Sequence, residues 1–221
     1  MHSILCVLCV VVFSSMLIAQ QAPVPVEEEP HHHVVLKNDY VLVMHVTLAP
    51  GESTLFHTHS HDRAAIQLTE ATISQQRPGE PEVAPEARKP GDVSASAADG
   101  PYTHRVHNVG SGVFEVLDVE LLQRPKDPAS KAVAPVETEN PSARVYKWTL
   151  APGSTSAMHT HDRPYLIIAA TPLVLKMTDP EGKSFTHEVK AGDVHWIDAK
   201  VTHTLANEGT VEGQIVEIEL K

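Results

Sequence analysis

The segment HTHSHDRAAIQL, residues 57–68, places three histidines, His57, His59 and His61, at alternating positions and then becomes apolar. A second segment, HTHDRPYLIIAA at residues 159–170, repeats this pattern with His159 and His161. In a β-strand, residues i and i+2 point to the same face of the sheet. Each segment, read as a strand, therefore directs a pair of imidazoles into one common space.

The two segments belong to an internal repeat. TLAPGES at residues 47–53 matches TLAPGST at residues 149–155, and the same 102 residues separate the two His-Thr-His segments. Farther along the chain, FEVLDVEL (114–121) and GQIVEIEL (213–220) lie 99 residues apart. Self-similarity over most of the chain predicts a tandem duplication.

The repeat defines the expected domains, which are residues 34–122 and residues 142–221. Four prolines and no apolar periodicity between them predict an extended surface linker at residues 123–141. Residues 21–33, with the sequence QAPVPVEEEPHHH, precede the first domain. Because this tail has little apolar surface, we expect it to be flexible, with its three histidines solvated. Weak metal binding by these histidines is the alternative.

Short strands account for the pattern inside each repeat. Apolar residues alternate or occur in short runs, as in YVLVMHVTL and ARVYKWTL, and Gly or Pro recurs roughly every 8 to 12 residues. Beyond the N-terminal segment, no stretch has an apolar stripe of helical period sustained over three turns. The sequence therefore predicts an all-β protein of two small barrels or sandwiches.

The charge of the chain limits its partners. Asp+Glu 28 against Lys+Arg 17 give a formal net charge of -11, and no basic cluster is interleaved with aromatic residues. Nucleic acid is therefore not an expected partner. We expect a small-molecule ligand or substrate, and a monomer or homodimer.

The first 20 residues, MHSILCVLCVVVFSSMLIAQ, contain no charged side chain. Their apolar run is shorter than the roughly 20 residues that span a membrane comfortably. It predicts a signal peptide over residues 1–20 and an exported protein, periplasmic or secreted. An uncleaved membrane anchor is the alternative, because no Lys or Arg precedes the run. Both cysteines, Cys6 and Cys9, lie here, so cleavage would leave no thiolate ligand or disulfide.

A third histidine recurs in both repeats. His203 and Asn207 correspond to His104 and Asn108, with two extra residues in the preceding turn of the first repeat. A barrel that brings this strand beside the first gives three imidazoles converging on one point, which is a facial metal site with open positions. Hydrogen-bonded strand histidines are the alternative. The six predicted metal ligands are His57, His59, His104, His159, His161 and His203.

With these motifs the chain resembles the cupin superfamily, and in particular a bicupin. The first cupin motif is a Gly, five residues, His-x-His, three or four residues, Glu, six residues and Gly. Gly51 begins the match in the first repeat and Gly153 in the second, while Gly192 begins the second cupin motif, which ends at Asn207. The resemblance covers both domains. It implies two tandem jelly-roll (double-stranded β-helix) barrels and a divalent metal ion, either Fe, Zn, Mn, Ni or Cu.

The chain departs from the family at the usual glutamate ligand, where Arg63 and Tyr165 stand. The resemblance implies sites of three histidines with more open positions, as in some thiol dioxygenases and diketone-cleaving enzymes, or degenerate sites that bind metal poorly. Without a carboxylate, affinity for metal should fall steeply below neutrality, because imidazole, with a pKa of about 6.5, binds only when neutral. A shifted pair, His59 with His61, stays open, although the ungapped repeat favours His57 with His59.

Three residues of the second repeat are candidates for a pocket: Arg163 as a carboxylate clamp, Tyr165 as a hydrogen-bond donor, and Trp196. Core packing explains the two aromatic residues equally well. Two functions stay open. One is an exported metalloenzyme of dioxygenase, isomerase or lyase type acting on a small organic acid or carbonyl compound. The other is a non-catalytic metal or small-ligand binding module or scaffold. We expect up to two ions per chain, bound more tightly in the second repeat.

Overall fold

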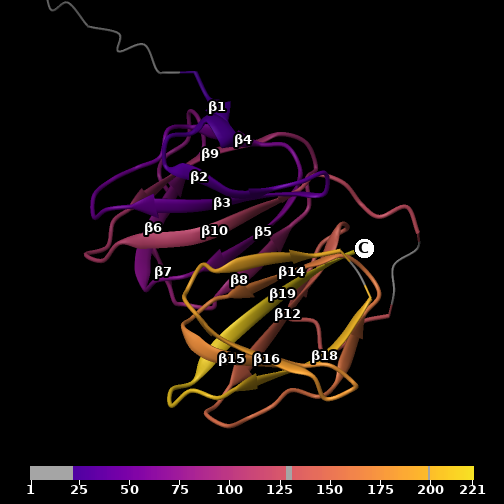
Figure 1. Ribbon diagram of the computed structural model, residues 1–221. Coiled ribbons are helices and arrows are strands. Elements are labelled where there is room, and N and C mark those ends of the chain that lie inside the picture. The colour runs from indigo at the N-terminus through magenta and orange to yellow at the C-terminus, as the bar shows by residue number, and fades with distance from the viewer. Residues whose placement is uncertain (1–21, 128–130, 199) are drawn as a thin grey trace, which may run out of the picture.

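The computed structural model describes residues 22–127, 131–198 and 200–221 (Figure 1). The predicted signal peptide lies outside these residues. Strands dominate the described chain, and its one helical element is a turn of 3-10 helix, η1 (Val26–Glu28). The all-β prediction is confirmed. No helix in the described ranges is long and apolar enough to span a membrane.

Two consecutive groups of strands correspond to the two repeats. The first group is β1 (Val24–Pro25), β2 (His32–Lys37), β3 (Val41–Leu48), β4 (His57–His59), β5 (Asp62–Gln67), β6 (Ala71–Gln76), β7 (Glu86–Arg88), β8 (Val93–Ser96), β9 (Tyr102–Asn108) and β10 (Phe114–Leu121). The second group is β11 (Thr138–Glu139), β12 (Ala143–Leu150), β13 (His159–His161), β14 (Tyr165–Ala169), β15 (Leu173–Thr178), β16 (Ser184–Val189), β17 (Val194–Ile197), β18 (Val201–Asn207) and β19 (Gly213–Leu220).

Each group forms two sheets that enclose a jelly-roll barrel. In barrel one the sheet orders are β1-β4-β9-β6-β7 and β2-β3-β10-β5-β8; in barrel two they are β11-β12-β19-β14-β17 and β13-β18-β15-β16. The histidine strands are antiparallel neighbours, so that His57 lies opposite His104 and His159 lies opposite His203. The chain therefore brings residues from distant parts of each repeat together between its two sheets.

The strands that close the barrels, β10 and β19, have two chemically different faces. One face is apolar, and its residues Leu117, Val119 and Leu121 from β10 share a buried cluster with Val216 and Ile218 from β19. Because this cluster contains residues of both barrels, it joins them. Burying one Leu, Val or Ile side chain completely stabilises a fold by roughly 1.5–3 kcal/mol relative to leaving it exposed. The shared cluster therefore stabilises the contact between the barrels.

A glycine with a positive φ lies at the contact between the barrels. A Cβ on Gly91 would lie 1.5 Å from Oε1 of Gln214 in the other barrel, and the φ of Gly91 is +80°. Any side chain at this position would strain the backbone and would have to displace the flexible amide end of Gln214. Gly91 therefore suits the positive φ of its turn and leaves room for Gln214.

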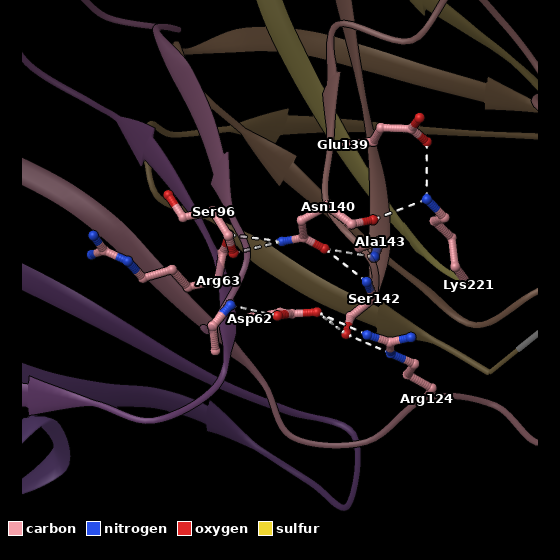
Figure 2. A network of polar contacts seen from close by, with 10 residues as sticks. Asp62, Arg63, Ser96, Arg124, Glu139, Asn140, Ser142, Ala143 and Lys221 are labelled. Carbon is pink, nitrogen blue, oxygen red and sulfur yellow. Dashed lines mark hydrogen bonds and ion pairs between the residues drawn. The ribbon is translucent and has the colours of Figure 1, made fainter. Parts of the chain in front are cut away.

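A polar network also joins the barrels through the end of the linker (Figure 2). Asp62 accepts hydrogen bonds from Ser142 Oγ at 2.5 Å and from Arg124 Nη2 at 3.2 Å. Asn140 donates from Nδ2 to the carbonyls of Arg63 at 3.0 Å and Ser96 at 3.2 Å. The end of the linker, expected as a surface segment, is therefore anchored, and its last residues include strand β11.

Residues 22–33 do not form the flexible tail that the sequence predicted. Strand β1 pairs with β4, Val26 packs into a small apolar cluster, and β2 begins at His32. The reason is Glu29, whose side chain is fully buried and hydrogen-bonded to His32 and to the backbone of Leu55. One buried carboxylate thus anchors a segment of low apolar content, and barrel one begins before residue 34.

Candidate metal centres

In barrel two, three histidines and a glutamate meet between the sheets. Each of His159, His161, His203 and Glu217 offers a ligand atom, and these atoms lie within 4.8 Å of one another, all buried. Nε2 of His203 is 2.9 Å from Nε2 of His159. The Glu217 carboxylate lies 3.3 Å from Nε2 of His159 and 3.2 Å from Nε2 of both other histidines.

These separations fit a metal ion. Bonds of about 2.1 Å place adjacent ligands about 3.0 Å apart in an octahedron and about 3.4 Å apart in a tetrahedron. Nε2 of His161 and Oε1 of Glu217 are buried, and each lies 3.2 Å from a polar atom of another residue in the group. Neither atom has a hydrogen-bond partner of good geometry. Ligand atoms that surround a common centre have this arrangement, because their lone pairs point at the centre and not at each other.

The outer nitrogens of two of these rings are fixed. Nδ1 of His159 donates to the carbonyl of Ala157 at 2.9 Å, and Nδ1 of His161 donates to Glu219 at 2.6 Å. Carboxylate and carbonyl partners of this kind set the tautomer and orientation of metal-binding histidines. Burial alone would lower the pKa of His161, but Glu217 and Glu219 outweigh it and raise the pKa to about 9. Burial would raise the pKa of Glu217, but its contacts with His159, His161 and His203 hold that pKa well below its usual value.

Barrel one contains the corresponding three-histidine cluster. Ligand atoms of His57, His59 and His104 lie within 4.8 Å of one another, and all three residues are buried. Nδ1 of each ring has an acceptor: the carbonyl of Leu55 at 3.0 Å for His57, Glu120 at 2.8 Å for His59, and Oε1 of Gln75 at 3.0 Å for His104. All three Nδ1 atoms therefore donate outward, and the Nε2 lone pairs remain for the centre.

In barrel one, the contact between His59 and His104 favours a cation between the two rings. Nε2 of His59 and Nε2 of His104 are 3.0 Å apart, although the hydrogen bonds at Nδ1 make both of them acceptors. Two lone pairs at this distance repel unless a cation lies between them. Burial, followed by the neighbouring histidines His32 and His59, lowers the pKa of His57 to about 3; burial also lowers the pKa of His104. A proton is therefore a poor occupant, and the donor set fits a divalent metal.

The expectation of carboxylate-free sites is wrong for barrel two. Glu217 on β19 takes the place of the glutamate that the first cupin motif lacks, and it comes from the opposite sheet. Its counterpart in barrel one is Asp118, one methylene shorter, which lies 3.6 Å from Nδ1 of His59 and outside the three-histidine cluster. The two sites therefore differ. Barrel two gathers four potential ligands in one group, whereas barrel one has one group of three histidines and a second group of His59, Asp118 and Glu120.

A cavity of about 130 Å³ lies beside the three-histidine cluster of barrel one. His57 and His104 line it together with Arg63, which the sequence places at the missing glutamate position. Arg63 stacks over the ring of Tyr102 at 5.1 Å and has no carboxylate partner among the described residues. The remaining wall includes three charged residues, Arg88, Asp92 and Asp118. Neutral polar and apolar residues complete it, among them Gln67, Gln75, Ser94, Val46, Ile73 and Phe114.

None of the predicted pocket residues of barrel two lines this cavity. Trp196 stacks on Tyr40 of barrel one, with ring centroids 5.6 Å apart, so it belongs to the inter-barrel contact. Arg163 lies 3.5 Å from Asp127 of the linker. Only Tyr165 lies beside the histidine cluster of barrel two, where it is fully buried and stacked on His161 with ring centroids 4.0 Å apart. His61, the alternative ligand, is largely outside, where its Nδ1 contacts Glu120 at 3.0 Å.

Comparison with known proteins places the fold. No family model matches the chain, and no curated protein does. The solved structure of AerE from Microcystis aeruginosa is 14% identical, covers 90% of this chain and 98% of its own, and has a TM-score of 0.60. A cupin 2 conserved barrel domain protein from Leptotrichia buccalis is 14% identical over 86% of this chain and 88% of its own, with a TM-score of 0.51.

A third similar structure is Bacillus subtilis oxalate decarboxylase, which is described with Mn(II) centres. It is 13% identical, covers 82% of this chain and 69% of its own, and has a TM-score of 0.50. At these identities the likeness shows the fold, which is the cupin fold in both halves of the chain. The two barrels in tandem therefore have the fold of these cupin structures, and the repeated motifs resemble the cupin motifs.

Sequence reasoning missed Glu217, although a signal was present. The closing segments FEVLDVEL and GQIVEIEL each place two acidic residues at alternating positions in an apolar strand, and these positions coincide in the two repeats. Buried acidic residues need partners. Their alternation puts Asp118 with Glu120, and Glu217 with Glu219, on the inner face. For His32, in contrast, the repeat gives no signal.

The pKa shifts predict different proton release on metal binding at the two sites. At pH 7.5, His161, with a pKa of about 9, carries a proton that a metal must displace, whereas His57 and His104 are already neutral. We expect about one proton per metal at barrel two and fewer at barrel one between about pH 6 and 8. Calorimetry in buffers of different ionisation enthalpy, on His104→Ala and His203→Ala, measures each site separately. Equal proton release in the two variants would contradict the pKa assignment.

Glu217→Gln should weaken metal binding in barrel two by about 100-fold or more, because it removes the anionic ligand and leaves the shape nearly unchanged. Asp118→Asn is the matched control in barrel one, where we expect a change of about tenfold or less. Competition with a chelator at fixed pH measures both. If the two variants lose affinity equally, Glu217 is not a ligand.

Proposed function

We propose that the protein is a metalloenzyme whose working site is in barrel one and which acts on a small organic acid. One observation carries this proposal: a three-histidine cluster borders a cavity that also presents Arg63, a cation without a carboxylate partner among the described residues. Three protein ligands leave coordination positions open for substrate. A neighbouring arginine offers two parallel hydrogen bonds to a carboxylate.

The cavity limits the substrate by size. A cavity of about 150 Å³ holds one benzene molecule, so the cavity of about 130 Å³ takes up to roughly six non-hydrogen atoms. Such a volume suits a carboxylic acid of two or three carbons. A divalent metal held by His57, His59 and His104 would supply Lewis-acid polarisation of the bound oxygen atoms. Arg63 would hold the carboxylate of the substrate.

The four-ligand site of barrel two supports a structural role. Glu217 completes its ligand set, and Trp148 donates to the same carboxylate at 2.7 Å while stacking on His159 at 4.6 Å. Tyr165 covers the other histidine of the strand. A site enclosed in this way has fewer open positions for substrate. We propose that its metal is retained and stabilises the barrel.

The identity of the metal stays among Fe, Zn, Mn, Ni and Cu. Imidazole suits most of these ions, and Mn(II) centres are described for a protein of the same fold. A non-catalytic module that binds metal and a small acid uses the same residues. The two functions separate on one result, which is whether the metal-loaded protein turns over any acid that it binds.

Arg63→Met should weaken the binding of small carboxylates to the metal-loaded protein by about 10- to 100-fold, because it removes a charge-assisted pair and keeps most of the apolar stem. Acetate and glycolate are suitable probes for calorimetry. Arg77→Met is the control, since Arg77 stacks on the same Tyr102 ring at 4.9 Å and does not line the cavity. Equal losses in both variants, or no binding of any small acid by the wild type, would overturn the proposal.

We propose export by the predicted signal peptide, for which the charge-free, apolar first 20 residues are the support. Mass spectrometry of the protein expressed with its full N-terminus in its host should then find a mature chain that begins near Gln20 or Gln21. Intact Met1 in a membrane fraction would establish the anchor instead.

A further inference from the structure

The geometry points to His32 as a ligand-contacting residue of barrel one, carried into the site by the N-terminal segment 22–32 and oriented by Glu29. This inference rests on the proposed function, because it concerns the molecule bound in the same cavity. It assigns that molecule to one class of small acid, the 2-hydroxy acids.

The segment is attached to the strand that carries the metal ligands. Strand β1 runs parallel to β4, with Val24 paired to His57, and the amide of Val24 donates to the carbonyl of Phe56 at 3.0 Å. The amide of Leu55, just before β4, donates to Oε1 of Glu29 at 3.0 Å. The N-terminal segment is thus an additional edge strand of the sheet that holds the site.

Glu29 has the contacts of a positioning residue. Its side chain is 0% exposed, and besides Leu55 it contacts the amide of His31 at 2.9 Å, Nδ1 of His31 at 3.1 Å and Nδ1 of His32 at 2.6 Å. Burial raises the pKa of Glu29, but the hydrogen bond from His32 and the other donors outweigh burial and bring it to about 2. A buried carboxylate is costly, and this one fixes one face of the His32 ring.

The other nitrogen of His32 is left for a ligand. The residue is 7% exposed, its ring centroid is 4.6 Å from that of His57, and it lines the cavity that Arg63 also lines. Nδ1 is taken by Glu29, and Nε2 has no hydrogen-bond partner within the described ranges. His32 is not part of any group of potential ligands whose atoms lie within 4.8 Å of one another. It therefore lines the cavity beside the three-histidine cluster without belonging to the cluster.

Arg63 and Nε2 of His32 are two of the polar groups that line this cavity, and together they suit one class of ligand. Apart from His57 and His104, the other polar residues of the lining are Gln67, Gln75, Arg88, Asp92, Ser94 and Asp118. Arg63 pairs with a carboxylate, whereas Nε2 of His32 needs a group that exchanges a single hydrogen bond. A hydroxyl next to the carboxylate provides this group, and it does so as donor or acceptor. Glycolate and lactate, with five and six non-hydrogen atoms, fit the cavity of about 130 Å³. Acetate has no hydroxyl group that could form a hydrogen bond with His32. Among the described residues of barrel two, β11 takes the place of β2 in its sheet, but no strand takes the place of β1 beside the histidine strand β13.

The test compares glycolate with acetate on the metal-loaded protein by calorimetry. His32→Phe should weaken glycolate binding about tenfold, the effect of one hydrogen bond, and change acetate binding less than about twofold. His33→Phe is the control, since His33 is the exposed neighbour on the same strand. His32→Gln, which keeps a hydrogen-bonding group near the position of Nε2, should restore part of the difference.

Two further readouts separate the roles. Metal stoichiometry should be the same in His32→Phe and wild type, and a loss of one ion per chain would overturn the inference by making His32 a metal ligand. Glu29→Gln should change the ¹⁵N shifts of the His32 ring and reduce the preference for glycolate, which a purely structural carboxylate would not do.

The outcomes distinguish this inference from the proposed function. If the wild type binds both acids and His32→Phe binds them as the wild type does, or loses both equally, the role of His32 is wrong and the proposed function stands. If the metal-loaded wild type binds neither acid, both are wrong. A folding defect in His32→Phe, detected by its melting temperature, leaves Glu29→Gln to decide: an unchanged preference for glycolate over acetate and unchanged ¹⁵N shifts of the His32 ring in that variant would overturn the inference.

Discussion

The strand that closes each barrel has to satisfy opposite requirements on its two faces. Toward the other barrel, β10 and β19 present leucine, valine and isoleucine, which form the shared core. Toward the interior they present two carboxylates each, and these are buried where water cannot solvate them. A buried carboxylate persists only with hydrogen bonds or a cation. Glu120 and Glu219 obtain hydrogen bonds from metal-facing histidines, so the fold and the histidine clusters depend on the same two strands.

From this shared plan the two barrels diverge through small changes. Glu217 reaches three histidines, while its shorter counterpart Asp118 stays at the edge of the cluster. In barrel two the aromatic rings of Trp148 and Tyr165 pack against the histidines. In barrel one the space stays open, and Arg63 enters its lining. Duplication thus supplies one site that the protein itself fills and another that keeps room for a ligand, which is the physical basis for assigning them different roles.

The sequence predicts much of this because repetition and strand period are local signals. Each of the pairs that begin at His57 and His159 shares a face in any strand, and the recurrence of a third histidine in both repeats predicts that it lies on a neighbouring strand. The rest depends on contacts between distant segments. No sequence pattern near Glu29 indicates that its carboxylate accepts a hydrogen bond from the amide of Leu55 and anchors the polar N-terminal segment. Trp196 packs on Tyr40 only because the two barrels are in contact. Glu217 lay within reach, since two alternating acids in an apolar strand are rarely accidental.

Anomalous X-ray scattering from crystals grown with Mn(II) or Zn(II) tests the central claim most directly. The account predicts two peaks per chain. One lies at bonding distance, about 2.1 Å, from Nε2 of His159, His161 and His203 and from the carboxylate of Glu217. The other has His57, His59 and His104 as its protein ligands, with its remaining positions facing the cavity. Peaks only at exposed histidines such as His33 or His187, with the two buried clusters empty at saturating metal, would contradict it.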